Sequence, residues 1–489
     1  MYERGGTGDQ ACTDAVRGEA YFARIRADEY GYLDEPAPGD RASAARGTAH
    51  IYLDHTGSGL PARRQLRLHA ARMTGAAWGN PHTDSPASAP STALVEEARR
   101  RILAYAGADP ADYTVVFTAN ATTACRLVGE AYPFRRRHGD LLLTLDNHNS
   151  VNGLREFARA RHGRTTYVPL SGPDLRLDEE RLAAALAERR RGLFAFPAQS
   201  NFSGVRHPLE WIGRAQEQGW QVLLDAAAYA PTSRLELSRF RPEFTVLSWY
   251  KVFGYPTGVG CLIARHDALA ALRRPWFSGG TIQVVSAHAQ WHRMAEGPAA
   301  FEDGTVNFHA IPEIITGLDW IEEVGVDAIR AHVERLTARL LARLTELRHD
   351  TGQPLVRLYG PDTTHRRGGT VALNVLDEAG RLVDERLIAR DSAAAGISLR
   401  AGCFCNPGAG EAAFAIGAAQ LARTGRHHHG LDTIDAYLDH LGLPTGGAVR
   451  VSLGLSSTAG DVDAFVDFLR TAYRNRTPDA QGLTARLTC

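Results

Sequence analysis

Short runs of β-branched, aromatic and leucine residues alternate with helical stretches from Ile51 onward. The runs lie at 51–53, 113–117, 141–145, 193–196, 221–224, 244–247 and 259–263. Such short apolar runs between helices are typical of a mostly parallel sheet covered on both faces. We therefore expect an α/β fold with a seven-stranded sheet. In such sheets, ligands bind beyond the carboxyl ends of the strands.

A different pattern begins past residue 310. Apolar residues recur every three or four positions, which predicts a long amphipathic helix; they are Ile329, Val333, Leu336, Leu340, Leu344 and Leu347. Runs at 367–376 and 449–453 are typical of strands. We predict an N-terminal arm that contributes to the small domain (1–50), a large domain (51–315), a smaller α+β domain (316–476) and a flexible tail (477–489).

Composition narrows the class of protein. With 44% hydrophobic and 22% charged residues and zero formal net charge, nothing favours nucleic acid or an anionic membrane as partner. No signal peptide and no run of about 18 apolar residues occurs, so we expect a cytoplasmic protein. The six cysteines are sparse, which favours a reactive thiol over a disulfide scaffold. Residues His427, His428 and His429 are adjacent and lack ligand spacing, so we predict no metal site.

The candidate chemistry centres on a residue type that is almost missing. Lys251 is the only lysine, and the other 54 of the 55 basic residues are arginines. A lysine can lose its proton near neutral pH and attack a carbonyl, whereas an arginine cannot. Lys251 is therefore a candidate Schiff-base lysine. The alternative is a chance survivor of a drift towards arginine codons.

A Schiff-base lysine serves an aldehyde cofactor, and the sequence offers supports for one. The segment 118–123 follows a strand and precedes a helical stretch, as a phosphate site requires. Asp225 directly follows the run 221–224 and could pair with a ring nitrogen, or could simply cap a helix. His148 could cover the ring, although a lone histidine is more often structural. These residues follow different strands of the predicted sheet and converge on one edge.

Five longer motifs resemble a known family. They are Asp146-Asn-His-Asn-Ser-Val, Gln199-Ser-Asn-Phe-Ser-Gly, Tyr250-Lys-Val-Phe-Gly-Tyr-Pro-Thr-Gly-Val-Gly, Phe301-Glu-Asp-Gly-Thr-Val-Asn-Phe and Arg400-Ala-Gly-Cys-Phe-Cys-Asn-Pro-Gly-Ala. Through them the chain resembles fold type I pyridoxal-phosphate enzymes of the class V aminotransferase family, in the cysteine desulfurase group. Within that group it is most similar to the desulfurase-like domain of molybdenum cofactor sulfurases. The resemblance implies pyridoxal 5'-phosphate as cofactor and a homodimer.

The resemblance also implies a role for each matching residue. Lys251 would form the Schiff base, Asp225 would pair with the pyridine nitrogen, and His148 would stack on the ring and take part in catalysis. Asn201 would bind the ring hydroxyl. The phosphate would be held by Ala121, Thr122, Ser248 and Tyr250, with Thr305 supplied by the second subunit. Arg450 would clamp the substrate carboxylate in a bidentate fork, assisted by Arg400; without the motif, either arginine would be taken for a surface charge.

The implied reaction is the desulfuration of L-cysteine to L-alanine. Cys405, on a glycine-flanked loop that can swing over the cofactor, would attack the substrate sulfur as a thiolate. Its persulfide would pass to a protein or small-molecule acceptor. Cys403 could share the persulfide or form a disulfide on oxidation, and a purely structural cysteine pair is the alternative.

One position separates this chain from a typical desulfurase. Ala228 stands where many cysteine desulfurases carry a glutamine, which leaves the ring hydroxyl to Asn201 alone.

The rival functions are a pyridoxal-phosphate lyase that acts on another amino acid or a sulfur conjugate in specialised metabolism, and a non-catalytic sulfur-carrier or scaffold protein.

Overall fold

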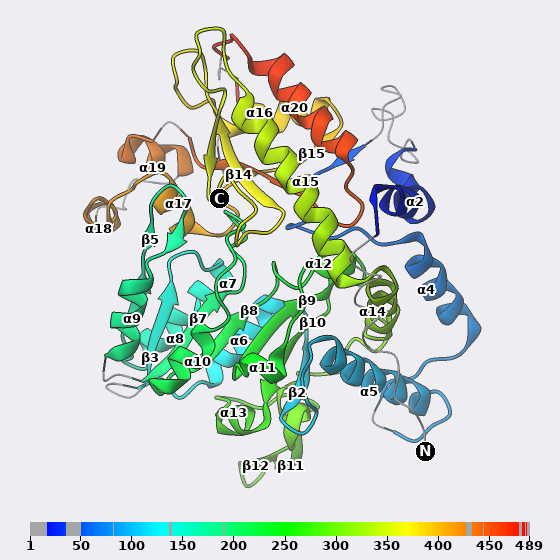
Figure 1. Ribbon diagram of the computed structural model, residues 1–489. Helices are drawn as coiled ribbons and strands as arrows, with labels where there is room; N and C mark the ends of the chain where they lie inside the picture. Colours follow the sequence, from blue (N-terminus) through cyan, green and yellow to red (C-terminus); the bar gives the residue numbers. More distant parts are fainter. Residues whose placement is uncertain are drawn as a thin grey trace, which may run out of the picture.

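A computed structural model of the chain describes residues 17–35, 50–81, 83–135, 139–188, 191–426, 433–443, 445–478, 482–484 and 486. Its central feature is a seven-stranded sheet (Figure 1). In spatial order the strands are β2 (Tyr113–Thr118), β10 (Gly260–Arg265), β9 (Phe244–Ser248), β8 (Gln221–Asp225), β7 (Gly192–Pro197), β3 (Asp140–Thr144) and β4 (Thr165–Val168). The strands from β9 to β4 are parallel, and β10 is antiparallel to both of its neighbours. The predicted mostly parallel seven-stranded sheet is confirmed.

One predicted strand of that sheet was wrong. The run at 51–53 forms β1 (Ile51–Tyr52), which pairs with β15 (Ile397–Ser398) outside the main sheet. Its place is taken by β4, which the apolar pattern did not reveal. The first three residues of β4 are only half-buried, because β4 is an edge strand, so it lacks the continuous apolar run of the central strands.

The helices cover both faces of the sheet, as the burial of the β7 side chains shows. Leu193, Phe194, Ala195 and Phe196 are all fully buried. Because successive side chains point to opposite faces, two of them pack towards each helical layer. Leu193 and Ala195 share a core with α6 (Ala121–Ala131), α8 (Leu154–Ala160) and α13 (His266–Ala271). Phe194 and Phe196 share a core with α9 (Glu179–Ala187) and α10 (Trp211–Glu217).

The remaining elements before residue 312 are mostly short. The helices are α4 (Arg63–Gly75), α5 (Ser88–Tyr105), α7 (Asn149–Asn152), α11 (Leu237–Phe240), α12 (Trp249–Phe253) and the 3-10 turn η2 (Gly297–Phe301). Two hairpins pair β5 (Leu170–Ser171) with β6 (Arg176–Leu177), and β11 (Ile282–Ser286) with β12 (Trp291–Met294). The β11–β12 hairpin projects away from the sheet at the bottom of Figure 1.

A second region is built on a long helix. After α14 (Pro312–Val324) the chain turns at Gly325, which has φ +87°, into α15 (Val326–Glu346). The predicted apolar stripe of α15 is buried and packs against α20 (Ala459–Tyr473), which confirms the helix and its inward face. The other helices are α16 (Glu385–Ala394), α17 (Pro407–Ala413), α18 (Ala418–Arg426) and α19 (Ile434–Leu441). The four-stranded sheet has the order β13 (Val356–Tyr359), β14 (Thr370–Val375), β17 (Ala448–Ser452) and β16 (Arg400–Gly402).

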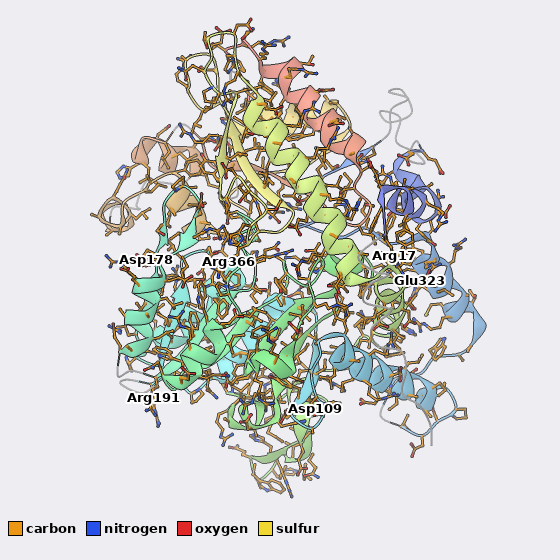
Figure 2. All side chains as sticks on the ribbon, viewed as in Figure 1. Arg17, Asp109, Asp178, Arg191, Glu323 and Arg366 are labelled. Carbon is orange, nitrogen blue, oxygen red and sulfur yellow. The ribbon has the colours of Figure 1, made fainter. Side chains whose placement is uncertain are left out.

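Residues 17–35, the first that the structure describes, contact this second region. These residues form the helix α2 (Glu19–Tyr30), which is followed by the 3-10 turn η1 (Gly31–Leu33). Arg17 donates to the backbone oxygen of Glu323 at 2.6 Å, and the two residues lie together in Figure 2. Phe22 stacks on His332 of α15 with ring centroids 3.9 Å apart. Most of the predicted arm, the three adjacent histidines and most of the tail lie outside the described residues.

The same described ranges lack two features. None of the helices found there has the length and hydrophobicity needed to span a bilayer. No three His, Cys, Asp or Glu side chains of the described chain gather as ligands for a metal ion.

Candidate active site

The carboxyl ends of the sheet strands surround one cavity of about 350 Å³. Its volume lies within the usual range of cofactor and small-ligand sites. Eight residues predicted to bind the cofactor line it: Ala121, Thr122, His148, Asn201, Asp225, Ser248, Tyr250 and Lys251. The rule that places ligands beyond parallel strand ends therefore located this cavity.

Lys251 lies in the short helix α12, which begins directly after β9. Trp249, Val252 and Phe253 of the same helix are buried, which fixes the backbone of Lys251 at the cavity wall. Loss of contact with water lowers the pKa of Lys251, and the nearby charge of Asp225 only partly opposes this. The neutral, nucleophilic form of the amine is thus reached at a lower pH than in a solvated lysine.

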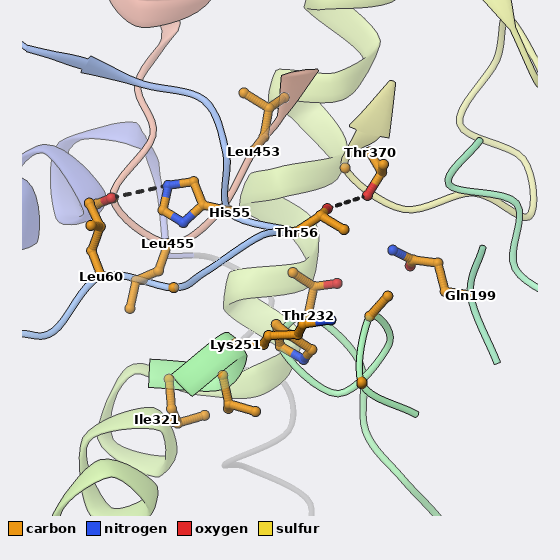
Figure 3. A pocket seen from close by; sticks show the side chains of 18 of the residues that line it. His55, Thr56, Leu60, Gln199, Thr232, Lys251, Ile321, Thr370, Leu453 and Leu455 are labelled. Carbon is orange, nitrogen blue, oxygen red and sulfur yellow. Dashed lines mark hydrogen bonds between the residues drawn. The ribbon is translucent and has the colours of Figure 1, made fainter. Parts of the chain in front are cut away.

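A second, smaller cavity of about 40 Å³ shares Lys251, Gln199, Ala227 and Ala228 with the first. Figure 3 shows its lining, in which the hydroxyls of Thr56 and Thr370 are hydrogen-bonded at 2.6 Å. Ala228 lines both cavities, so the position that departs from the desulfurase pattern is where they meet. The second cavity can hold a water molecule.

The predicted phosphate site is the first turn of α6. The side chain of Asn120 accepts from the Thr123 N–H at 2.9 Å and caps the helix, and the Ala121 N–H donates to Ser248 Oγ at 2.9 Å. The 11-residue helix points its positive end towards the cavity, which Ala121 and Thr122 of its first turn line. The local structure therefore suits an anionic group.

Asp225 is the last residue of β8. Its Oδ1 accepts from the Ala227 N–H at 3.0 Å, so the carboxylate caps the turn that follows and also lines the cavity. The capping alternative is therefore satisfied by one oxygen alone.

The geometry around His148 identifies its tautomer. The Ser150 N–H, which can only donate, lies 3.1 Å from His148 Nδ1, and the Ser150 hydroxyl lies 2.8 Å from the same atom. Nδ1 is therefore the acceptor, and the proton of the neutral ring is on Nε2. Burial, reinforced by the charge of Lys251, lowers the pKa of His148 to about 4. The imidazole is thus neutral at physiological pH.

Ser150 links His148 to the phosphate site and was missed by the sequence analysis. Its hydroxyl lies 2.6 Å from the Thr122 hydroxyl. Its place in the motif Asp146-Asn-His-Asn-Ser-Val was a signal that could have found it. Gln199 and Thr257 also line the cavity without having been predicted as ligands, and Asn120 lines it from within the predicted phosphate segment 118–123.

The two arginines predicted to bind the substrate carboxylate face each other on neighbouring strands, Arg400 on β16 and Arg450 on β17. Both already bind a carboxylate of the chain itself. Asp54 Oδ1 accepts from Arg450 Nη2 at 2.9 Å, and Asp54 Oδ2 accepts from Arg400 Nη2 at 2.7 Å. Arg450 Nη1 also donates to the backbone oxygen of Asn201 at 3.1 Å. The bidentate fork stays a prediction, since both Nη atoms of Arg450 have internal partners.

Asp54 was missed by the sequence analysis. Burial alone would raise the pKa of Asp54, but hydrogen bonds from Arg400 and the charges of both arginines outweigh burial and hold that pKa below its usual value. Asp54 follows an apolar run, and the strand-end rule applied to Ile51–Leu53 could have found it. Two cations and one anion leave a net positive charge at this point.

The two cysteines of the 400–409 motif differ in state. Cys405 is a free, exposed thiol, whereas Cys403 is disulfide-bonded. The two therefore do not form a disulfide with each other. Cys405 interacts electrostatically with both Arg400 and Arg450, so the thiol lies near the arginine pair.

Thr305 does not line the same cavity. It lines a neighbouring one of about 270 Å³, which shares Ala119 and Gly258 with the first. Within one chain the site thus holds all the predicted cofactor ligands except the one expected from a second subunit.

The cavity fits pyridoxal phosphate. It offers a lysine with a lowered pKa, a carboxylate at a strand end, a capped helix start beside two hydroxyls, and a neutral histidine. These are the groups that an aldehyde, a basic ring nitrogen, a phosphate and an aromatic face each require.

Comparisons with known proteins agree with this geometry. The family model described as Aminotransferase class-V matches residues 51–465. Molybdenum cofactor sulfurase of Arabidopsis thaliana is 33% identical over 92% of this chain and 60% of its own length, and that of Homo sapiens is 35% identical over 86% of this chain and 49% of its own length. This chain therefore spans only about half to three-fifths of these curated relatives.

Among solved structures, the apo cysteine desulfurase of Thermococcus onnurineus NA1 superimposes with a TM-score of 0.73 at 22% identity, covering 92% of this chain and 97% of that one. The cysteine desulfurase CsdA of Escherichia coli gives a TM-score of 0.69 at 22% identity, covering 92% and 98%. The likeness confirms the predicted fold type I.

Proposed function

We propose that this chain, which belongs to the aminotransferase class-V family, takes sulfur from L-cysteine onto its own Cys405 and passes it to an acceptor. As a member of this family the chain is a pyridoxal-phosphate-dependent enzyme. Relatives named molybdenum cofactor sulfurase and structural neighbours named cysteine desulfurase support sulfur transfer. The substrate, the acceptor and the use of Cys405 are the proposal.

The observation that carries the proposal is an exposed free thiol whose loop is hydrogen-bonded to the wall of the cavity that contains Lys251. The backbone oxygen of Phe404, next to Cys405, accepts from Asn201 Nδ2 at 2.8 Å, and Asn201 lines the cavity. A purely structural cysteine would be expected in the core, as Cys125 and Cys261 are.

The residues of the chain divide the work of binding and proton transfer. When bound, pyridoxal phosphate supplies an electron-withdrawing ring that acidifies the α-proton of an attached amino acid. Asp225 would hold the ring nitrogen, and the first turn of α6 with Ser248 would hold the phosphate. Lys251, whose pKa is lowered by burial, would accept the α-proton in its unprotonated form. His148 can donate only through Nε2, because its Nδ1 accepts from Ser150.

Arg450 and Arg400 orient the substrate, since their net positive charge with Asp54 suits one carboxylate. The Cys405 thiolate then attacks the sulfur of the bound cysteine. An S–S bond forms as the substrate C–S bond breaks, the bonding electron pair leaves with the carbon, and that carbon takes up a proton to give alanine. The sulfur remains on Cys405 as a persulfide that a second thiol can accept.

A product assay tests this function. We expect cofactor-loaded protein with L-cysteine and a thiol reductant to give alanine and sulfide in equal amounts. Pyruvate and ammonia would instead identify the rival lyase. Protein that stays colourless and takes up no pyridoxal phosphate would favour the scaffold alternative. Lys251→Arg should lose the visible absorbance of the bound cofactor, because arginine cannot supply a neutral amine.

A matched pair of variants tests the nucleophile. Cys405→Ser should retain the cofactor and release no alanine, whereas Cys403→Ser should remain active in reductant. Normal turnover of Cys405→Ser together with an inactive Cys403→Ser would move the nucleophile to Cys403.

We also propose that the enzyme is a homodimer in which Thr305 completes the phosphate site of the partner. Support comes from Thr305 lying outside the cavity of its own chain and from a cluster of exposed apolar side chains at and before the β11–β12 hairpin: Trp276, Phe277, Val284, Val285 and Trp291. Analytical ultracentrifugation should give twice the chain mass; a monomer at working concentrations would contradict the proposal.

A further inference from the structure

The loop that carries Cys405 has a backbone conformation that needs support. Phe404 and Cys405 have φ of +57° and +52°, in the left-handed region that residues with a Cβ rarely occupy. Each such residue costs roughly 1–2 kcal/mol relative to the right-handed region. Contacts elsewhere must therefore hold the loop in place.

The main contact is Asn406, which is fully buried. Its Nδ2 donates to the backbone oxygen of Asp146 at 2.7 Å and to Asn201 Oδ1 at 2.8 Å. Its Oδ1 accepts from the Ala409 N–H at 3.2 Å and caps α17. Every hydrogen-bonding position of the Asn406 amide group except one oxygen lone pair is used.

A second set of contacts fixes Phe404 and Cys405 themselves. The Asn149 N–H donates to the Cys405 backbone oxygen at 2.7 Å. The Phe404 ring packs on Phe202 with centroids 5.3 Å apart, and the guanidinium of Arg450 lies 4.8 Å from its centre. The loop therefore rests on the arginine that is expected to bind the substrate.

Asn201 joins these contacts to the cavity. Its Oδ1 accepts from Asn406, one N–H donates to Phe404, and its backbone oxygen accepts from Arg450. A side-chain amide has two N–H donors, so one remains for a group in the cavity that Asn201 lines. One amide thus contacts the nucleophile loop, its anchor and the cofactor site.

We propose that Asn201 and Asn406 couple cofactor binding to the placement of Cys405. An acceptor in the cavity, such as the ring hydroxyl of pyridoxal phosphate, takes the second Asn201 N–H and fixes its amide in the orientation that also holds Phe404 and Asn406. The cofactor thereby stabilises the loop, and by reciprocity the ordered loop strengthens cofactor binding. Asn406 is then a positioning residue. This inference rests on the proposed function.

Asn406→Ser isolates the coupling. Serine can still cap α17, but is too short to reach both Asp146 and Asn201. The readouts are backbone hydrogen exchange over residues 402–406 and alkylation of Cys405, each with and without pyridoxal phosphate. Among the free cysteines of the described chain Cys405 is exposed and the others are buried, and mapping the alkylated peptide separates Cys405 from Cys12 and Cys489. His349→Ala, which removes two hydrogen bonds of a buried side chain in the second region, is the control for general destabilisation.

In the wild type and in His349→Ala, we expect pyridoxal phosphate to slow exchange and alkylation of the loop by roughly five-fold or more, the usual lower end of such couplings. In Asn406→Ser the loop should exchange fast with or without cofactor, and cofactor affinity should fall by a similar factor. A cofactor analogue that lacks the ring hydroxyl should bind the wild type without protecting the loop.

Two results would overturn the inference: equal protection by pyridoxal phosphate and the analogue, or an equal response to pyridoxal phosphate in the wild type and Asn406→Ser. Neither readout needs turnover, so the inference can fail while the product assay still succeeds. Protein that takes up no pyridoxal phosphate at all would instead remove the proposed function.

Discussion

The change Asp54→Asn tests the charge arrangement at the arginine pair. It removes the carboxylate shared by Arg400 and Arg450 and keeps the shape of the side chain. In the wild type, Asp54 binds both arginines and thereby holds Arg450 beside Asn201, a residue of the cavity wall. The substitution leaves two guanidinium groups without that negative charge.

The magnitude follows from how deeply each arginine is buried. The Arg450 side chain is only 3% exposed, and a buried charge that loses its partner costs about 3–5 kcal/mol. The Arg400 side chain is 51% exposed, so its loss stays within about 1 kcal/mol. Asparagine keeps one acceptor oxygen for Arg450. We therefore expect a loss of about 3 kcal/mol in the free energy of unfolding.

The pH dependence has a definite sign. Because the pKa of Asp54 is held below its usual value, the stabilisation by its carboxylate is complete above the unfolded-state pKa of about 3.9 and is lost as pH falls through the lower folded-state pKa. The difference between wild type and variant should therefore stay constant from about pH 8 down to about pH 5.

Urea unfolding followed by tryptophan fluorescence measures the effect. Asp463→Asn is the control, because Asp463 also binds two arginines, Arg339 and Arg343, but at the surface, and should cost less than about 1 kcal/mol. An Asp54→Asn variant no less stable than this control would refute the reasoning. The variant also frees Arg450 Nη2, so we expect a lower KM for L-cysteine in the alanine assay.

Three further results are expected. Lys251→Met should stabilise the cofactor-free protein at pH 7, because burial disfavours the charged amine of Lys251 and lowers its pKa. Between that lowered pKa and the ordinary unfolded-state value, the folded wild type binds fewer protons than the unfolded chain, so the advantage of the variant should shrink by up to about 1.4 kcal/mol per pH unit towards pH 10. A pH-independent difference in urea unfolding would contradict this expectation. Ser150→Ala removes a hydrogen bond to His148 worth about 1 kcal/mol, so cofactor affinity in an absorbance titration should fall about five-fold rather than stay the same. Gly204→Ala, whose Cβ would lie 2.3 Å from a backbone oxygen of β14, should lower the melting temperature clearly more than Gly172→Ala, which has a similar φ and open space around it.

The parts that sequence predicted best are those with a local signal. The run Leu193–Phe196 is apolar throughout because both faces of β7 are covered, and this continuity identified the central strands. Lys251 was found by its composition alone, and Asp225 by its place directly after a strand. In each case the physical cause lies within a few residues of the position it explains.

The parts that sequence missed depend on distant partners. Asp54 meets Arg450 across 396 positions of the chain, and Asn406 meets Asn201 across 205. No periodicity reports such contacts. The edge strand β4 was missed for a different reason, because partial exposure allows polar residues that hide its strand character.

The single lysine at the wall of the cavity has a consequence for anyone who handles this protein. A protease that cuts only after lysine has one possible site in all 489 residues, the bond between Lys251 and Val252. Val252 is 8% exposed and lies in the short helix behind the cavity, so the folded chain shields that bond. The amount of cleavage into two fragments would therefore measure the fraction of molecules in which α12 has locally unfolded. Local unfolding elsewhere in the chain would produce no cleavage.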